Sequence, residues 1–293
     1  MRKKHLKLIV WLLLVLSFSS AVSAQQATLQ TEKSSTTVQD LKLASKLMAR
    51  QMPYKIILPS KYDTEKTKRY SVIYLLHGLT GHYDNWTAKT KIAEYAAQYN
   101  YIIVTAEGDD GWYSDSVTKT NDKYESYIVK ELIPEIDKNF RTVADKKHRS
   151  IAGLSMGGYG SIKFGLKYPE MFSIVGSFSG ALPATGWNDK NSAAWLSKSI
   201  MTVFGEAANE TRLTNDIYKI VREMPDAKKK TLPFIYLDCG TEDFLIQPNR
   251  DFAALLFDKK IPHEFRQLPG KHDWNYWNSQ VQEFLELSAK FIK

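Results

Sequence analysis

Short apolar runs alternate with segments of helix length from residue 52 to the end of the chain. Several runs are apolar at nearly every position, which is typical of strands buried on both faces of a sheet. Alternation of such strands with helices predicts an α/β fold, with a mostly parallel central sheet and helices on both faces. The expected strands are Tyr54–Leu58, Tyr70–Leu76, Tyr101–Ala106, His148–Gly153, Phe172–Ser179, Leu232–Gly240 and His263–Leu268, and the expected helices are Lys89–Gln98, Lys123–Phe140, Gly158–Lys167, Pro248–Asp258 and Asn278–Ile292.

One long segment, residues 183–230, interrupts this alternation. It contains two helix-like patches, Ala193–Phe204 and Leu213–Met224, and no convincing strand. An insertion of this length between two core strands can lie over the end of the sheet and shape a pocket, or it can be inert helical packing. The pattern alone favours neither role.

The N-terminus carries the pattern of an export signal. A basic head precedes the apolar run Leu8–Phe18, and small residues follow at Val22–Ala24, so residues 1–24 are predicted to be a signal peptide. The run is short for a bilayer span, which disfavours a retained anchor. Residues 25–45 are polar and lack aromatic residues, so we expect a linker or loosely held arm there, followed by one α/β domain over residues 46–293.

Charge and cysteine content exclude some partners. The chain has 40 Lys+Arg against 32 Asp+Glu. Loss of the signal peptide with its four basic residues would lower the number of Lys and Arg residues to 36. So small a surplus, with no basic block longer than Lys228–Lys230, argues against a nucleic-acid partner. The single Cys239 cannot form an internal disulfide. It also lies far from the cleavage point, so no cysteine is placed there to carry a lipid anchor. We therefore expect an exported protein, periplasmic or secreted, with no membrane anchor after signal cleavage.

A G-x-S-x-G motif at Gly153–Gly157 indicates a nucleophilic serine. It follows the expected strand that ends at Gly153 and precedes the expected helix Gly158–Lys167, which is the setting of a nucleophile elbow. Glycines suit this sharp turn because neighbouring Cβ atoms would collide in it. Ser155 is therefore the candidate nucleophile, and a structural serine in a tight turn is the alternative interpretation.

A serine hydroxyl is a weak nucleophile at neutral pH and needs a base. Of the six histidines, His272 lies in the loop after the last expected strand. Loops at strand ends can bring a base to the nucleophile, so His272 is the candidate base. His77, at the end of an earlier strand, is better interpreted as bracing its glycine-rich turn than as a second base.

The base in turn needs a carboxylate to hold its tautomer. The loop after Leu232–Gly240 offers Asp243, with Glu242 as the fallback, whereas Asp238 belongs to the end of the strand itself. The resulting chain order of Ser, Asp and His is the one expected on a sheet of this type. An oxyanion hole would then use the backbone N–H groups of Met156 and Leu79, the latter in the glycine-rich turn after Tyr70–Leu76.

Several motifs in register resemble the esterase D-type branch of the α/β hydrolases. They are YLLHGLTG, GWYSD (Gly111–Asp115), AGLSMGGYG (Ala152–Gly160), SFSGAL (Ser177–Leu182), DCGTEDFL and LPGKHDW. That branch includes tributyrin esterases, S-formylglutathione hydrolases, family-one carbohydrate esterases such as feruloyl and acetylxylan esterases, and mycolyl transferases. The export signal disfavours the cytosolic glutathione-thioester role, and nothing marks an acyl channel of mycolate length.

The resemblance implies an α/β-hydrolase fold and a serine carboxylesterase that needs no metal or organic cofactor. It makes Ser155 the nucleophile, Asp243 the acid and His272 the base, with Leu79 and Met156 as backbone oxyanion donors. We expect hydrolysis of short-chain or sugar-linked acetyl and feruloyl esters. Acyl transfer by the same triad is one alternative, and a catalytically silent binding module is another, although that role has no need of all three residues.

Aromatic residues near the expected site loops are candidate substrate contacts. We assign this role to Trp112, Tyr113 and Trp274, because aromatic walls suit a feruloyl or sugar ester. The alternative is that these rings simply pack the loops. Trp277 also lies near these loops, and Trp86 and Trp187 are further rings that can join them.

Overall fold

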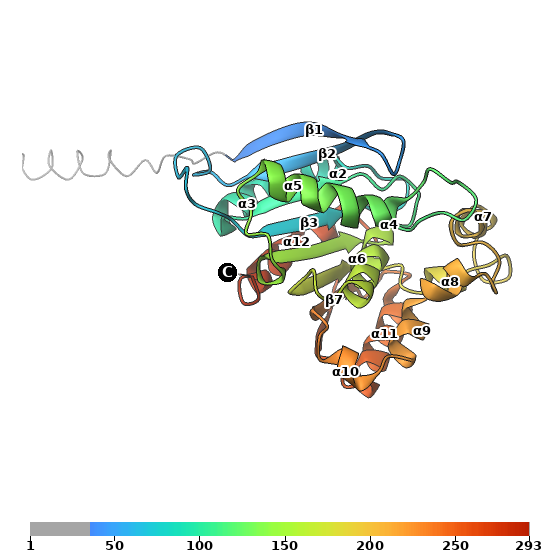
Figure 1. Cartoon of the computed structure of the whole chain (residues 1–293). Coiled ribbons are helices and arrows are strands. Elements are labelled where there is room, and N and C mark those ends of the chain that lie inside the picture. Colours follow the sequence, from blue (N-terminus) through green and yellow to red (C-terminus); the bar gives the residue numbers. More distant parts are fainter. Residues whose placement is uncertain (1–35, 293) are drawn as a thin grey trace, which may run out of the picture. The chain divides into compact units, whose positions relative to one another are not determined.

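The computed structural model describes residues 36–292. Their central element is an eight-stranded sheet (Figure 1). The strands are β1 (Thr37–Ser45), β2 (Arg50–Leu58), β3 (Val72–Leu76), β4 (Ile102–Ala106), β5 (Arg149–Leu154), β6 (Ile174–Phe178), β7 (Phe234–Gly240) and β8 (His263–Leu268). They lie in the order β1-β2-β4-β3-β5-β6-β7-β8. β2 pairs antiparallel with β1 and with β4, whereas all other neighbours are parallel.

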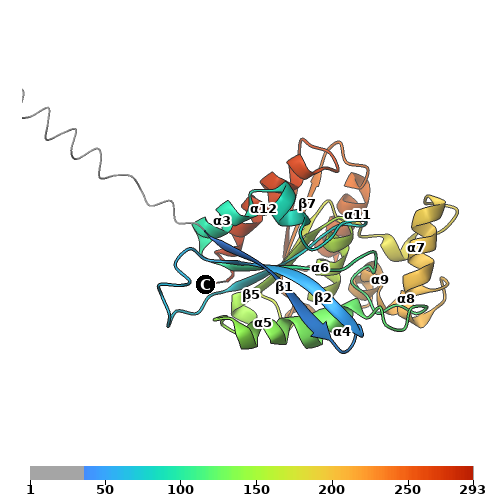
Figure 2. The same ribbon diagram turned by 90° about the horizontal axis from the view of Figure 1, so that it is seen from above.

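Helices cover both faces of the sheet (Figures 1 and 2). One face shares an apolar cluster with α2 (Asn85–Lys89), α3 (Ile92–Tyr99) and α12 (Trp274–Ser288). The other face is covered by α4 (Tyr124–Tyr127), the π-helical turn η1 (Ile128–Leu132), α5 (Ile133–Asn139), α6 (Met156–Lys167) and α11 (Ile246–Asp258). The predicted α/β-hydrolase fold, a mostly parallel sheet between two layers of helices, is confirmed.

Strand β3 shows why its residues are apolar throughout. All five are buried, and alternate side chains enter different clusters, Tyr74 on the face of α6 and Ile73 on the face of α12. Successive residues of a strand point to opposite faces, so a central strand covered on both sides buries the side chains of both faces, and apolar side chains are favoured at every position. This double burial explains the apolar runs in the sequence.

The segment between β6 and β7 is helical, as predicted. It contains the short turn η3 (Ala184–Gly186), α7 (Ala194–Phe204), α8 (Glu210–Thr214), α9 (Ile217–Arg222) and α10 (Asp226–Lys229). The second expected patch is divided because Asp216 caps a new helix: its side chain accepts a hydrogen bond from the N–H of Lys219 at 3.0 Å. In Figure 2, α7 and α8 lie beyond the end of the sheet.

Residues 37–45 correct the expectation of a loose arm over residues 25–45. They form β1, which pairs with β2 from Thr37 opposite Leu58 to Ser45 opposite Arg50. The strand is at the edge of the sheet and largely exposed, so main-chain hydrogen bonds hold it and its side chains can be polar.

The predicted signal peptide, and residues 25–35, lie outside the described residues. Within residues 36–292, no helix combines the length and apolar character needed to cross a membrane.

Candidate active site

The carboxyl ends of three parallel strands carry the predicted chemistry. Ser155 follows β5 directly, Asp243 follows β7, and His272 follows β8. Because parallel strands end at the same edge of a sheet, loops far apart in the sequence meet there. The structure brings these three side chains into hydrogen-bonding contact.

Ser155 occupies a strained turn between β5 and α6. Its φ of 52° and ψ of −114° lie where residues with a Cβ are rarely found. The turn is held by the Ser155 N–H, which donates to the carbonyl of Phe178 at 2.9 Å. At Gly157 an added Cβ would lie 2.5 Å from the carbonyl oxygen of Leu76, so the helix can approach β3 this closely only with glycine there.

The serine, histidine and aspartate form one chain of hydrogen bonds. Ser155 Oγ lies 3.1 Å from His272 Nε2, and His272 Nδ1 lies 2.8 Å from Asp243 Oδ2. A carboxylate at Nδ1 favours the tautomer with its proton on that nitrogen, which leaves the Nε2 lone pair free to accept the serine proton. The geometry is therefore that of a hydroxyl poised for deprotonation.

The environment of Asp243 keeps its carboxyl group ionised. Burial acts to raise its pKa, but the hydrogen bond and charge of His272 and the N–H of Leu245, which donates to Oδ1 at 2.8 Å, hold the pKa below its ordinary value. By contrast, burial raises the pKa of Asp238 well above its usual range. Glu242 is exposed, and its carboxylate lies 3.7 Å from Lys271 Nζ. The structure thus places Asp243, and not the fallback Glu242, against His272.

The turn that carries Leu79 lies at the end of β3. It is closed by the N–H of Gly81, which donates to the carbonyl of Gly78 at 3.0 Å. The next N–H, that of Thr80, donates to Asp110 Oδ1 at 2.7 Å. Met156 begins α6, where N–H groups have no partner within the helix and the helix dipole is positive. The oxyanion roles of Leu79 and Met156 stay predictions.

His77 braces the same turn, and this interpretation of the residue is confirmed. Its side chain is fully buried, with Nδ1 2.7 Å from the carbonyl oxygen of Gly78. Nε2 lies 3.0 Å from Glu107 Oε1, and the hydroxyl of Tyr113 donates to the His77 carbonyl at 3.0 Å. The imidazole therefore ties the β3 turn to the loop after β4.

Glu107 strengthens this connection. It is buried at the end of β4, where Oε1 lies 3.0 Å from His77 Nε2 and accepts the N–H of Asp109 at 2.8 Å. Burial acts to raise the pKa of Glu107, but His77 and these backbone donors lower it to about 2. The carboxylate is therefore ionised and holds both loops.

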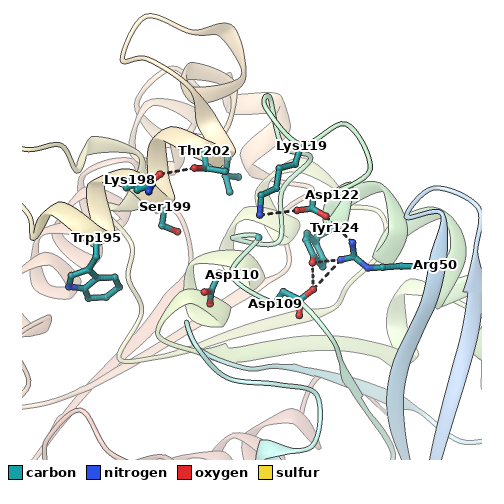
Figure 3. A pocket seen from close by; sticks show the side chains of 12 residues that line it. Arg50, Asp109, Asp110, Lys119, Asp122, Tyr124, Trp195, Lys198, Ser199 and Thr202 are labelled. Carbon is teal, nitrogen blue, oxygen red and sulfur yellow. Dashed lines mark hydrogen bonds and ion pairs between the residues drawn. The ribbon is translucent and has the colours of Figure 1, made fainter.

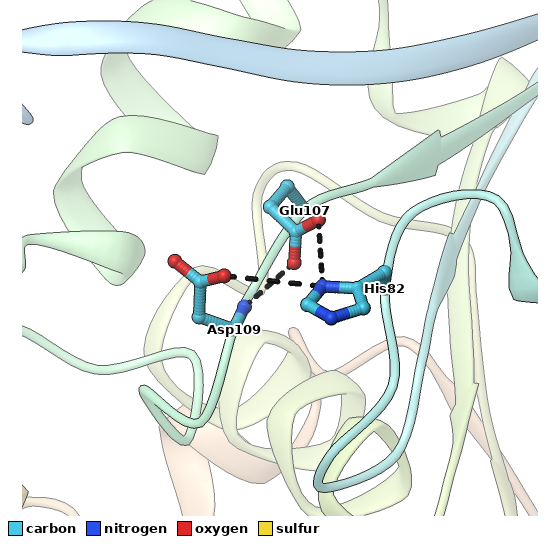
Figure 4. A group of neighbouring side chains, drawn as sticks. All are labelled: His82, Glu107 and Asp109. Atoms are coloured by element: carbon cyan, nitrogen blue, oxygen red, sulfur yellow. Dashed lines mark hydrogen bonds and ion pairs between the residues drawn. The ribbon is translucent and has the colours of Figure 1, made fainter.

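Figure 4 shows a group that the sequence spacing does not reveal, formed by His82, Glu107 and Asp109. His82 Nδ1 lies 3.3 Å from Glu107 Oε2 and 4.0 Å from Asp109 Oδ1. The imidazole nitrogen and carboxylate oxygens of these residues all lie within 4.8 Å of one another, which is close enough for them to coordinate one cation together. Because Glu107 already accepts several hydrogen bonds, we interpret the group as part of the brace.

Two of the predicted substrate contacts are wrong. Trp112 is 1% exposed and Tyr113 is fully buried, so neither offers a ring face to a ligand arriving from solvent. Trp112 Nε1 donates to Ser199 Oγ on α7 at 2.9 Å, and Tyr113 packs beneath the β3 turn. These rings pack the loops, which is the alternative that the sequence leaves open.

Two aromatic rings do contact the imidazole. The Phe244 ring centroid lies 4.7 Å from that of His272, and Trp277 lies 4.9 Å away, edge to face. Phe244 is 73% exposed, so its ring is available to a substrate. Sequence reasoning missed it, although an apolar residue directly after Asp243 in a polar loop was a usable signal. Trp274 is half-buried against Trp277, and its substrate role stays a prediction.

A buried ion-pair network joins α6 to α4 and to the loop after β4. Glu125 accepts from Lys163 Nζ at 2.8 Å and pairs with Lys167 at 2.6 Å. Lys163 also donates to the carbonyl of Tyr113 at 2.6 Å. Burial lowers the pKa of Lys163 to about 8, and burial also acts to raise that of Glu125, but the two lysines lower the latter to about 2. The network therefore fixes the nucleophile helix α6 against α4 and that loop.

Acid should weaken this network. The charged Glu125 carboxylate stabilises the folded state fully above about pH 4.5, and this contribution is lost as the pH falls toward about 2. Between pH 6 and pH 3 we expect the free energy of unfolding to fall by about 2 kcal/mol from this group, because in the folded protein a carboxyl group with a pKa of about 2 is still mostly ionised at pH 3. Urea unfolding at pH 6, 4 and 3 measures it. The double variant Glu125→Gln/Lys163→Met, which removes both charges together, should lose less stability over this range, and an equal loss would contradict the assignment.

Comparisons with known proteins identify the chain as an esterase. The sequence pattern of the Esterase family, described as "Putative esterase", matches residues 45–286. An acetyl esterase of Caldicellulosiruptor saccharolyticus is 29% identical over 264 residues, which cover 86% of this chain and 98% of that protein. A solved ferulic acid esterase is 27% identical with a TM-score of 0.78, covering 88% of this chain and 99% of that one. FphF, a fluorophosphonate-binding serine hydrolase of Staphylococcus aureus, is 25% identical with a TM-score of 0.75, covering 87% and 98%.

Proposed function

Since this chain belongs to the Esterase family and is a carboxylic ester hydrolase, we propose that it cleaves esters through an acyl-enzyme formed on Ser155. The observation that carries the proposal is the hydrogen-bonded chain from Ser155 Oγ through His272 to Asp243, at 3.1 and 2.8 Å. A serine with a base and an orienting carboxylate in line is the arrangement that activates a hydroxyl for attack on a carbonyl.

In the first half of the reaction, His272 Nε2 takes the Ser155 proton as Oγ bonds to the ester carbonyl carbon. The imidazolium that forms is stabilised by the Asp243 carboxylate, which is already ionised. His272 then donates the proton to the alcohol oxygen as its bond to the carbonyl carbon breaks. The alcohol leaves, and the acyl group stays on Ser155.

The negative oxygen of the tetrahedral intermediate needs donors that are already in place. The N–H groups of Leu79 and Met156 would supply them, one from the β3 turn and one from the positive end of α6. The His77 and Glu107 brace holds the first of these in position. Such preorganised donors contribute on the order of 3 kcal/mol each to transition-state stabilisation.

Water completes the cycle. His272 removes a proton from a water molecule, whose oxygen attacks the acyl carbonyl carbon, and then returns that proton to Ser155 Oγ as the acyl bond to it breaks. The products are the carboxylic acid and a free Ser155. Each proton moves through His272 Nε2, so the triad alone accounts for the acid–base steps.

For the substrate we propose short-chain or sugar-linked esters, with acetyl or feruloyl as the acyl group. The acetyl esterase relative and the ferulic acid esterase neighbour support this class. We also propose export after cleavage at Ala24, since the basic head and apolar run of residues 1–24 have the pattern of a signal peptide.

An ester panel tests the proposed substrates. We expect the purified protein to hydrolyse p-nitrophenyl acetate and at least one of acetylated xylan and methyl ferulate, measured as kcat/KM for each ester. Hydrolysis of p-nitrophenyl acetate alone would remove the sugar-linked class and leave a general short-chain esterase. No hydrolysis of any ester would contradict the function itself.

A further inference from the structure

A cavity of about 610 Å³ lies between the helical insertion and the loop after β4 (Figure 3). Side chains of α7 form one wall, and side chains of the β4 loop and of β2 form the other. One lining residue, Asp110, contacts a turn of the candidate site, because its carboxylate accepts the N–H of Thr80 at 2.7 Å. Thr80 directly follows Leu79, so a residue of the cavity wall contacts the proposed oxyanion turn.

The charges that line this cavity balance. Arg50, Lys119 and Lys198 supply three positive side chains, and Asp109, Asp110 and Asp122 supply three negative ones. Arg50 contacts both Asp109 and Asp122 at 3.0 Å. A balanced set of this kind offers many hydrogen-bond donors and acceptors but no net attraction for an ion. It suits a neutral ligand rich in hydroxyl groups better than a phosphate or a free carboxylate.

Trp195 adds a flat apolar surface to the same cavity. It lies in the first turn of α7 with 62% of its area exposed, although large apolar side chains are usually buried. Figure 3 places its indole at the edge of the cavity, on the α7 side. A sugar ring presents C–H groups on its faces and hydroxyls around its rim, so it can stack on an indole while polar groups bind the rim.

We propose that this cavity is a subsite for a neutral saccharide, the sugar part of the ester substrate. The inference rests on the proposed function and deepens it, because it assigns sugar recognition to the insertion rather than to the aromatic residues near His272. The insertion thus has a specific role: α7 brings Trp195 and Lys198 to the wall of the cavity.

Binding without catalysis is the first test. Xylohexaose, which carries no ester, is titrated by calorimetry into the Ser155→Ala protein, whose triad cannot act. We expect saturable binding that weakens about tenfold in Ser155→Ala/Trp195→Ala. The matched control is Ser155→Ala/Phe257→Ala, which removes an exposed ring on α11 and should bind as Ser155→Ala does. No binding of xylohexaose, or equal binding by the Trp195 variant, would overturn the subsite.

Kinetics separates the subsite from the proposed function. With Ser155 intact, Trp195→Ala should raise KM for acetylated xylo-oligosaccharide about tenfold and leave kcat/KM for p-nitrophenyl acetate unchanged. Equal KM values for the oligosaccharide would overturn the subsite while the esterase function stands. A native protein that cleaves no ester but still binds xylohexaose through Trp195 would overturn the proposed function and support the saccharide site.

Discussion

Replacing Ser155 by alanine should lower kcat for p-nitrophenyl acetate by about a millionfold, because residues of a triad act as one unit and the nucleophile has no substitute. The protein should stay folded. The substitution removes the hydrogen bond from the half-buried Ser155 side chain to His272 Nε2, but the backbone hydrogen bonds that hold the turn remain. Steady-state kinetics measures the loss, and a fluorophosphonate probe, which bonds to an activated serine, should label the native protein alone.

An exposed serine provides the control. Ser279→Ala, on the solvent side of α12, should label and hydrolyse as the native protein does. If the native protein took no label, the chain would be the catalytically silent module on the hydrolase scaffold. If Ser155→Ala kept most of its activity, the nucleophile would be another residue.

The core of the site could be predicted because each of its residues lies in the loop or turn that follows a parallel strand. Ser155 and Asp243 follow the buried strands β5 and β7, and His272 follows the half-buried edge strand β8. Parallel strands bring their carboxyl ends together whatever their distance along the chain. The glycines around Ser155 identify the turn itself. Burial pattern and turn chemistry are local properties, so the sequence alone is enough for them.

The parts that could not be predicted depend on contacts between distant segments. Strand β1 is polar because it lies at an exposed edge, where backbone pairing with β2 replaces apolar burial, and its sequence therefore looks like a linker. Trp112 looks like a substrate contact until α7 covers it. Whether an aromatic ring in a loop faces solvent depends on what packs over it, and here that is the insertion.

The cavity next to the oxyanion turn shows the same limit. Arg50, Asp110 and Trp195 come from three regions of the sequence, and none of them has a local pattern that marks a binding site. Only the fold brings them to one space. Charge balance and the exposed indole can be evaluated only after the walls of the cavity are known.

Asp243→Asn should lower kcat by about ten thousandfold, while the matched change Glu242→Gln leaves it close to the native value. The asparagine would keep the size of the side chain, but its amide can donate a hydrogen bond to Nδ1 of His272 and so favour the tautomer with the proton on Nε2. That tautomer cannot accept the proton of Ser155. The lost carboxylate charge also removes stabilisation of the imidazolium.

Glu242 is the matched control because it is exposed beside Lys271 and does not contact the imidazole, so its neutral variant tests the loop without altering the tautomer. Stopped-assay kcat values for both proteins distinguish the carboxylates. A large loss in Glu242→Gln with a small one in Asp243→Asn would show that the loop rearranges in the working enzyme. The 2.8 Å contact between Asp243 and His272 would then not be the catalytic one.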